Sequence, residues 1–454
     1  MENDYGRKKQ SRHRNTLIAL SFGYFIDQGA AQSMGVLQNS ILRYFPGMTP
    51  SLFGLMETLR TVLQTISAPV WGYASDKYSR KRILIIATML WGLWTILVGM
   101  SPNFETLIIM RAISGFGLGC IMPATFSLVA DHFPQARRGM AMGFIGLMQL
   151  LGTIAGVLAL GFATGGDAWR WGFVGLGIVG LISGIVIWLL VVEPPRGAAE
   201  PELAELLQEG ADSGYKINIK DMLSTLRIPT IWAAIAQGVT GTVPWVVMGI
   251  DMIKWMVTEL GYSESIDFSK AKGSAPLIFA GILVGSAISS LMGGLIGDYA
   301  EKINPKYGRT VIGQFSVFCG VPLTYILFTQ GARLSFLQMF GLAFFTALLI
   351  GWPGRGAKEP MMQAVVVPEL RSSAYSVVSL IEGWLSAFGG LIAGVLIEQI
   401  GITNAMLWMI PFPWVICGLF FSLFYFTYPR DAAKARAHIG EMREKLLIAK
   451  QNNA

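Results

Sequence analysis

The chain has 454 residues, of which 53% are hydrophobic and 14% are charged, and its formal net charge is +7 at pH 7. Soluble domains carry about 25% charged residues, so this composition excludes an ordinary soluble protein. The apolar residues come in runs of roughly 20 or more, the length that crosses ~30 Å of hydrocarbon. We therefore expect a multi-pass membrane protein.

The hydrophobic runs predict an all-α protein with twelve transmembrane helices. In chain order we expect them at about 16–38, 51–74, 83–101, 106–130, 139–162, 171–193, 230–256, 275–297, 310–329, 335–366, 373–398 and 404–428. The first run is too long, and too soon followed by another, for a cleaved signal peptide.

A polar stretch rich in Ala and Glu separates the sixth span from the seventh and divides the chain into two sets of six. We expect four regions: an N-terminal six-helix bundle (1–193), a cytoplasmic linker (194–228), a C-terminal six-helix bundle (229–429) and a cytoplasmic tail (430–454). In the tail, apolar residues alternate with charged ones at helical spacing, a pattern typical of an amphipathic helix.

Lys and Arg are concentrated in the two termini and in the loops on their side of the membrane, and they are sparse in the opposite loops. Because basic residues stay on the cytoplasmic side, we expect a bacterial-type inner (plasma) membrane protein with both termini in the cytoplasm. The positive net charge then reflects topology and anionic headgroups. We expect the lipid bilayer, and no nucleic acid, as a partner.

Metal and cofactor motifs are missing from the sequence. The cysteines (Cys120, Cys319 and Cys417) lie inside hydrophobic runs, and no HExxH or CxxC motif occurs. No histidine lies in a predicted span, and no nucleophile–base pair is evident. We therefore expect no metal, no cofactor and no catalytic residue, which disfavours a membrane enzyme.

Short motifs recur in the two halves. Gly72-x-x-x-Asp76 follows the second span, with Arg80 four residues later. Gly294-x-x-x-Asp298 follows the eighth span, with Arg309 after an insertion. Repeated halves with a site at their interface are a transporter architecture.

The loop from Gly72 to Arg80 resembles the signature loop of the major facilitator superfamily, although Ser79 stands where that family usually has glycine. Arg111-x-x-x-Gly115-x-Gly117 resembles a second family motif. The resemblance covers nearly all of the chain, and it implies two six-helix bundles related by pseudo-two-fold symmetry. We expect Asp76 to accept hydrogen bonds from Arg80 and from a neighbouring helix N-terminus, which would hold the cytoplasmic side closed. The alternative is a solvated turn.

A narrower resemblance is to the Spinster-type branch of that superfamily. The residues that support this resemblance are Tyr24-Phe25-Ile26-Asp27, Trp91-x-x-Trp94-Thr95 and Pro123-Ala124-Thr125. That branch has arginine where this chain has Gln28. It also has a glutamate near the position of Leu118, and this glutamate is absent here. These departures leave a lysolipid-type substrate as an alternative only.

Charged residues inside spans are costly and usually mark substrate or ion paths. Ten lie well inside the predicted spans: Asp27, Glu57, Arg60, Arg111, Asp251, Lys254, Arg355, Lys358, Glu359 and Glu382. Asp27 and Glu382 fall near the midplane, so we expect them to carry the coupling proton, with Asp27 as the first candidate and Glu382 as the second. Glu57 and Arg60 share a helix face, and we expect them to modulate Asp27. The alternative is that these charges form structural ion pairs.

The predicted tenth span, 335–366, is too long for a single crossing and is broken by Gly351-Trp352-Pro353-Gly354-Arg355-Gly356. Broken backbone at membrane depth is tolerated beside protein or a watery cavity. The segment departs from a nucleotide-binding loop at Ala357 and Glu359, so we reject ATP binding. We expect Arg355 and Lys358 to form a cationic surface for a carboxylate, sulfate or phosphate. The alternative is pairing with Glu359 or Glu382.

The sequence thus predicts a secondary active transporter that moves a small organic anion or amphipathic solute by alternating access, with a proton or another ion coupled to it. We expect Arg355, Lys358, Arg111, Tyr24, Trp245 and Trp352 to bind the substrate. A passive facilitator whose charges are structural remains an alternative, as does a membrane sensor or receptor.

Overall fold

The computed structural model describes residues 2–31, 33–48, 50–161, 163, 166–203, 218–262 and 273–452, and all regular secondary structure within these ranges is helical. The first half contains α1 (Glu2–Ala31), α2 (Ser33–Tyr44), α3 (Pro50–Lys77), α4 (Arg80–Gly99), α5 (Phe104–Leu118), α6 (Ile121–His132), α7 (Gln135–Gly161) and α8 (Ala168–Leu190).

The second half begins with the short helix α10 (Ile219–Ser224) and the turn η1 (Thr225–Arg227). It continues with α11 (Pro229–Thr258), α12 (Ala275–Ile303), α13 (Gly308–Gln330), η2 (Gly331–Arg333), α14 (Phe336–Ile350), η3 (Pro353–Lys358), α15 (Glu359–Val365), η4 (Pro368–Leu370), α16 (Arg371–Ile400), α17 (Ile402–Met409) and α18 (Pro411–Asn452). Helix α18 runs without interruption from the membrane into the tail.

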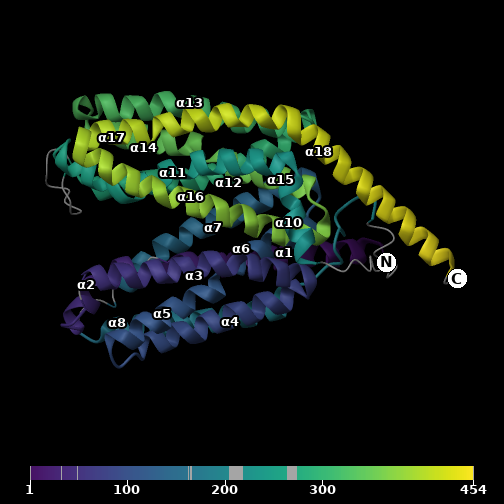
Figure 1. Cartoon of the computed structure of the whole chain (residues 1–454), viewed down its shortest axis with the longest axis horizontal. Coiled ribbons are helices and arrows are strands. Elements are labelled where there is room, and N and C mark those ends of the chain that lie inside the picture. The colour runs from purple at the N-terminus through teal and green to yellow at the C-terminus, as the bar shows by residue number, and fades with distance from the viewer. Residues whose placement is uncertain are drawn as a thin grey trace.

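Ten helical stretches in the described ranges are long and apolar enough to cross a membrane. With α1 and α3, the described helices form two six-helix bundles, one from each half of the chain (Figure 1). The two chain ends lie at the same end of the molecule, at the right of Figure 1. The expected twelve-span, two-bundle fold is confirmed.

Three of the expected spans are broken helices within the described residues, and one of them is the twelfth, expected over 404–428 and divided into α17 and α18 at Ile410. The tenth consists of α14, η3 and α15, as its glycines and prolines predict. The fourth, expected as one helix over 106–130, is instead divided into α5 and α6 at Gly119 and Cys120. This break was not predicted, although Pro123 follows it and cannot donate a backbone hydrogen bond to the carbonyl of Gly119.

The two bundles contact each other through α7 with α12 and through α3 with α16. We call the side on which α8 ends and residues 191–203 lie the linker side. Here α7 and α12 approach so closely that a Cβ added to Gly294 would lie 2.1 Å from the carbonyl oxygen of Gly139. Glycine is therefore needed at position 294 for the bundles to close on this side.

Candidate functional site

A cavity of about 620 Å³ lies between the bundles, with walls from α1, α6 and α7 on one side and from the second bundle on the other. Its polar lining residues include Gln28, Gln149, Thr153, Gln237, Arg355, Lys358, Glu359 and Tyr375. Trp245 and Trp414 form an apolar part of the wall, with ring centroids 5.9 Å apart in a T-shaped arrangement. We call this space the first cavity.

The broken tenth span places the two predicted cations on the cavity wall. Residues Pro353–Lys358 form a π-helix, a form that occurs mostly as single turns and frequently at functional sites. The break also lets Gly356 pack directly on α12, because a Cβ at Gly356 would lie 2.3 Å from the carbonyl oxygen of Gly293. Arg355 and Lys358 both line the first cavity as a result.

Both cations are paired with carboxylates in this structure. One guanidinium nitrogen of Arg355 lies 2.8 Å from each carboxylate oxygen of Glu359, and another donates to Gln149 at 3.0 Å. The ammonium group of Lys358 donates to both oxygens of Glu382, at 2.9 and 3.1 Å. The pairings that the sequence left open as an alternative are therefore both present.

Glu382 reaches Lys358 across a glycine of α11. A Cβ on Gly238 would lie 2.0 Å from a carboxylate oxygen of Glu382. The Lys358 and Glu382 side chains are 14% and 13% exposed, so the pair is largely withdrawn from solvent while Lys358 borders the cavity.

A second, smaller cavity of about 260 Å³ adjoins the first and shares Gln28, Met122, Gln149 and Tyr375 with it. Tyr24 and Asp27 line this second cavity. The Asp27 carboxylate accepts a hydrogen bond from Gln28 at 3.1 Å.

The expected influence of Arg60 on Asp27 is not a direct contact. The guanidinium of Arg60 donates to Glu57 at 2.9 Å and to Gln64 at 2.9 Å. Glu57 in turn accepts from Arg111 at 2.8 Å. These three charged residues form one chain of ion pairs that joins α3 to α5.

The predicted substrate-binding residues therefore separate into three groups. Arg355, Lys358 and Trp245 line the first cavity, and Tyr24 lines the second. Arg111, paired with Glu57, is not among the lining residues of either cavity. Trp352 is also absent from both linings and packs on α12, where a Cβ at Gly293 would lie 2.6 Å from its Cα.

Sequence reasoning missed the neutral lining residues, including Gln149, Tyr375 and Trp414. Candidate site residues were predicted from charged side chains inside apolar spans, and amides and aromatic hydroxyls have no charge. A glutamine in the middle of an otherwise apolar helix is a weaker signal of the same kind, since it too needs a polar partner in a membrane.

On the linker side, an aspartate of each half accepts hydrogen bonds from backbone N–H groups near the start of a helix in the other half. Asp76 accepts from the backbone N–H groups of Ser372 and Ser373, at 3.2 and 2.6 Å, at the start of α16. Asp298 accepts from Gly139 and Met140, at 3.0 and 2.8 Å, near the start of α7. We call these paired contacts the latch. A carboxylate at a helix N-terminus is favoured by the helix dipole.

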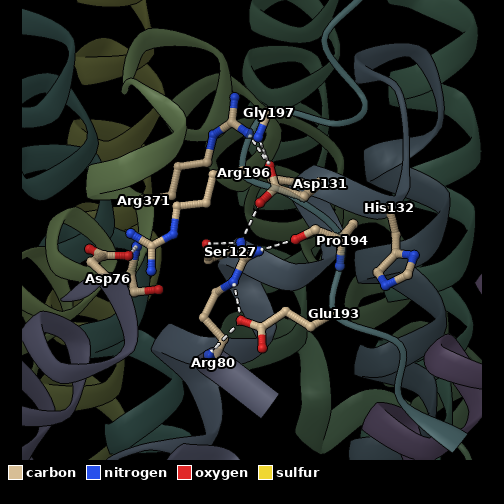
Figure 2. A network of polar contacts seen from close by, with 12 residues as sticks. Asp76, Arg80, Ser127, Asp131, His132, Glu193, Pro194, Arg196, Gly197 and Arg371 are labelled. Atoms are coloured by element: carbon tan, nitrogen blue, oxygen red, sulfur yellow. Dashed lines mark hydrogen bonds and ion pairs between the residues drawn. The ribbon is translucent and has the colours of Figure 1, made fainter. Parts of the chain in front are cut away.

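The expected hydrogen bond from Arg80 to Asp76 is wrong. Figure 2 shows Arg80 directed to Asp131 of α6, with further contacts to Ser127 and to the carbonyl of Pro194. Its Nε also lies 3.4 Å from Glu193. The reason is that the Asp76 oxygens are occupied by the N-terminus of α16, whereas Asp131 lies buried beside Arg80. In the second half Arg309 does donate to Asp298, at 2.6 Å.

The beginning of the linker is built into this closed side. Glu200 accepts from Arg138 of the first bundle at 2.7 Å and also from Arg371 of the second. Burial alone would raise the pKa of the Glu200 carboxyl, but the guanidinium groups of Arg371 and Arg138 lower it to about 2. Asp131 accepts from the backbone N–H of Gly197 at 2.9 Å (Figure 2). The described part of the linker therefore connects both bundles.

Replacing Asp76 with asparagine is expected to weaken the latch. The amide keeps the shape but loses the charge that favours the α16 N-terminus, an interaction of up to ~2 kcal/mol when partly buried, or roughly thirtyfold in the opening equilibrium. Transport by purified protein in vesicles should slow several-fold, with normal folding by gel filtration. The matched control is Asp167→Asn, at an exposed position. Transport by Asp76→Asn at the wild-type rate would contradict this role.

Comparison with known proteins gives matches in sequence and in fold. The sequence model of the Major Facilitator Superfamily matches residues 20–366. A multidrug resistance protein B homolog from Mycobacterium tuberculosis is 32% identical over 149 residues, 33% of this chain and 26% of that protein. This chain thus spans about a quarter of the length of that first relative.

Other relatives match over more of their length. A putative metabolite transport protein from Haemophilus influenzae is 23% identical over 405 residues, 86% of this chain and 89% of that protein. A probable galactarate/D-glucarate transporter from Bacillus subtilis, GudP, is 26% identical over 252 residues, 53% of this chain and 54% of that protein.

Two solved structures share the fold. The proton:xylose symporter XylE, bound to 6-bromo-6-deoxy-D-glucose, superposes with a TM-score of 0.68 at 16% identity, covering 92% of this chain and 95% of that one. The human organic anion transporter MFSD10 superposes with a TM-score of 0.61 at 16% identity, covering 91% and 99%. At this identity the likeness is one of fold alone.

Proposed function

This chain belongs to the major facilitator superfamily, and we propose that it is a secondary transporter that moves a small organic anion together with a proton. The observation that carries the proposal is the ion pair between Lys358, which borders the first cavity, and Glu382 behind it. A proton can neutralise Glu382 while an anion takes the place of its carboxylate on Lys358, so the net charge of the site does not change.

The charges around the first cavity balance. Arg355 is matched by Glu359, and Lys358 by Glu382. Removing one partner of a buried ion pair costs roughly 3–5 kcal/mol, because the other charge is left unpaired. A solute anion can therefore bind Lys358 at low cost only when Glu382 has taken up a proton and become neutral.

Coupling follows from this exchange. When Glu382 is protonated, Lys358 is free to donate its hydrogen bonds to the solute, and the net charge of the site is unchanged. After the bundles open to the other side, loss of the proton restores the carboxylate, which reclaims Lys358 and releases the anion. One proton then accompanies each monovalent anion, and alternating access supplies the two environments that such a carboxylate needs.

The lining favours an organic acid over an inorganic ion. The Arg355 guanidinium and the Gln149 amide offer donors to a carboxylate, sulfate or phosphate, while Trp245 and Trp414 offer an apolar wall. The relative named as a galactarate/D-glucarate transporter points in the same direction. We also propose that the linker side is cytoplasmic, as the distribution of basic residues indicates.

Glu382 is a better supported proton carrier than Asp27, the first candidate from the sequence. Glu382 forms an ion pair with Lys358, a cation on the wall of the first cavity, whereas the hydrogen-bond partner of Asp27 in the described structure is the neutral amide of Gln28. A passive facilitator is the second candidate, since every cation on the cavity wall is already paired. It predicts that a pH gradient has no effect on accumulation.

Replacing Glu382 with glutamine tests this mechanism, because glutamine mimics the protonated acid. In sealed vesicles loaded with a panel of carboxylates, wild-type protein should accumulate the transported anion when a pH gradient is imposed. Glu382→Gln should lose at least tenfold in accumulation, yet keep the exchange of labelled for unlabelled anion. The matched control is Glu398→Gln, on the same helix but exposed.

Each result has a distinct meaning. Full gradient-driven accumulation by Glu382→Gln would remove Glu382 from coupling. Wild-type protein that exchanges the anion but never accumulates it would favour the passive facilitator.

A further inference from the structure

The second cavity contains a buried acid that no cation neutralises. Asp27 is 7% exposed, and it forms no ion pair within the described part of the chain. Each nitrogen of the nearby Arg60 guanidinium is hydrogen-bonded to another residue, namely Glu57, Gln64 or Thr61. An isolated buried carboxylate is expensive unless it takes up a proton or a positive charge joins it, and the cavity of about 260 Å³ beside Asp27 has room for a small cation.

A second polar group in the cavity also lacks a partner. The hydroxyl of Tyr24 is buried, with the residue 1% exposed, and it forms no hydrogen bond to any described residue. Tyr24 and Asp27 are three residues apart on α1, so they lie on the same helix face, and both line the cavity. Buried polar groups are usually satisfied, so the unpartnered hydroxyl beside the unpaired acid offers a second oxygen ligand for a cation in this cavity.

The break between α5 and α6 adds further oxygen atoms. Leu118, Gly119 and Ile121, at the break, all line the cavity. The carbonyl groups at a helix C-terminus carry partial negative charge. The carbonyl of Gly119 also has no donor four residues later, because Pro123 has no N–H. Carbonyl oxygens at broken helices coordinate monovalent cations in other membrane transporters.

We propose that the second cavity is a binding site for a small monovalent cation, held by the Asp27 carboxylate, the Tyr24 hydroxyl and the carbonyl oxygens at the α5–α6 break. A single carboxylate matches a single positive charge, and hard cations prefer oxygen ligands. Two sources share this chemistry: a free sodium ion, and the ammonium group of a solute that reaches in from the first cavity past Gln28 and Gln149. The site is distinct from the proton and anion site at Glu382 and Lys358.

Thermal unfolding of the purified full-length protein tests the site without any transport substrate. A ligand that binds only the folded state raises the unfolding temperature in a saturable way. Sodium should do so when it replaces choline at constant ionic strength, and methylammonium chloride is titrated separately in the same manner. Asp27→Asn should weaken the apparent affinity at least tenfold. Tyr24→Phe, which removes one oxygen and little else, should weaken it several-fold.

Glu382→Gln is the matched control, since it disables the proposed proton site but leaves the second cavity intact. It should keep the wild-type cation response, so failure of the transport mechanism and failure of the cation site are distinguishable. A response to sodium assigns the site to a free ion, and a response to methylammonium alone assigns it to an ammonium group. No saturable response to either cation, or an equal response in Asp27→Asn, would overturn the proposal.

Discussion

Replacing Lys358 with methionine is expected to weaken anion binding by roughly 10–100-fold and to destabilise the protein. The substitution leaves the Glu382 carboxylate buried without its cation, which costs roughly 3–5 kcal/mol for a fully buried pair. We expect about 3 kcal/mol here, the lower end of that range, because Lys358 borders a cavity. Loss of a charge-assisted hydrogen bond to the anion, about 1.5–3 kcal/mol, weakens binding by roughly 10–100-fold.

A second variant separates the two effects. Combining Lys358→Met with Glu382→Gln removes the unpaired charge, so most of the lost stability should return while anion binding stays weak. Unfolding by heat, with and without a panel of organic anions, measures both quantities. Lys302→Met, at an exposed position of α12, is the matched control. A Lys358→Met protein with wild-type anion affinity would show that the cation is purely structural.

Replacing Gly294 with valine is expected to reduce transport by at least a hundredfold while each bundle remains folded. A Cβ at this position would lie 2.1 Å from the Gly139 carbonyl oxygen of the opposite bundle, and 2.6 Å from the Gly139 carbonyl carbon. Backbone atoms cannot move aside as a flexible side chain can. The bundles would therefore be unable to close on the linker side, and the latch at Asp298 would not form.

The matched control for this variant is Gly175→Val. Gly175 is also within a helix, but an added Cβ meets no atom within 4 Å. Gly175→Val therefore has the same change in helix propensity as Gly294→Val but not the steric clash. Transport in vesicles measures the effect, and retained anion binding in detergent shows that the protein is folded. Transport by Gly294→Val within about twofold of the control would mean that the bundles do not need this close contact.

The sequence by itself determined the class of the protein and much of its outline. A bilayer admits only helices or closed barrels, so apolar runs of the right length predict the spans without knowledge of any contact. Prolines and glycines act locally, which is why the break in the tenth span was predictable. The latch aspartates could be predicted from their repetition, and the charges of the cavity wall from their cost in hydrocarbon.

Only the tertiary structure decided which charges meet. Arg80 pairs with Asp131 and not with Asp76, and Arg111 with Glu57 away from both cavities. Glu200, in a segment that the sequence predicts as a linker, joins Arg138, 62 residues before it, to Arg371, 171 residues after it. Such partners depend on helix rotation and on how closely two bundles approach. A charged residue inside a predicted span must have a polar or charged partner, and this can be inferred from the sequence. Which residue becomes that partner depends on how helices far apart in the sequence pack together.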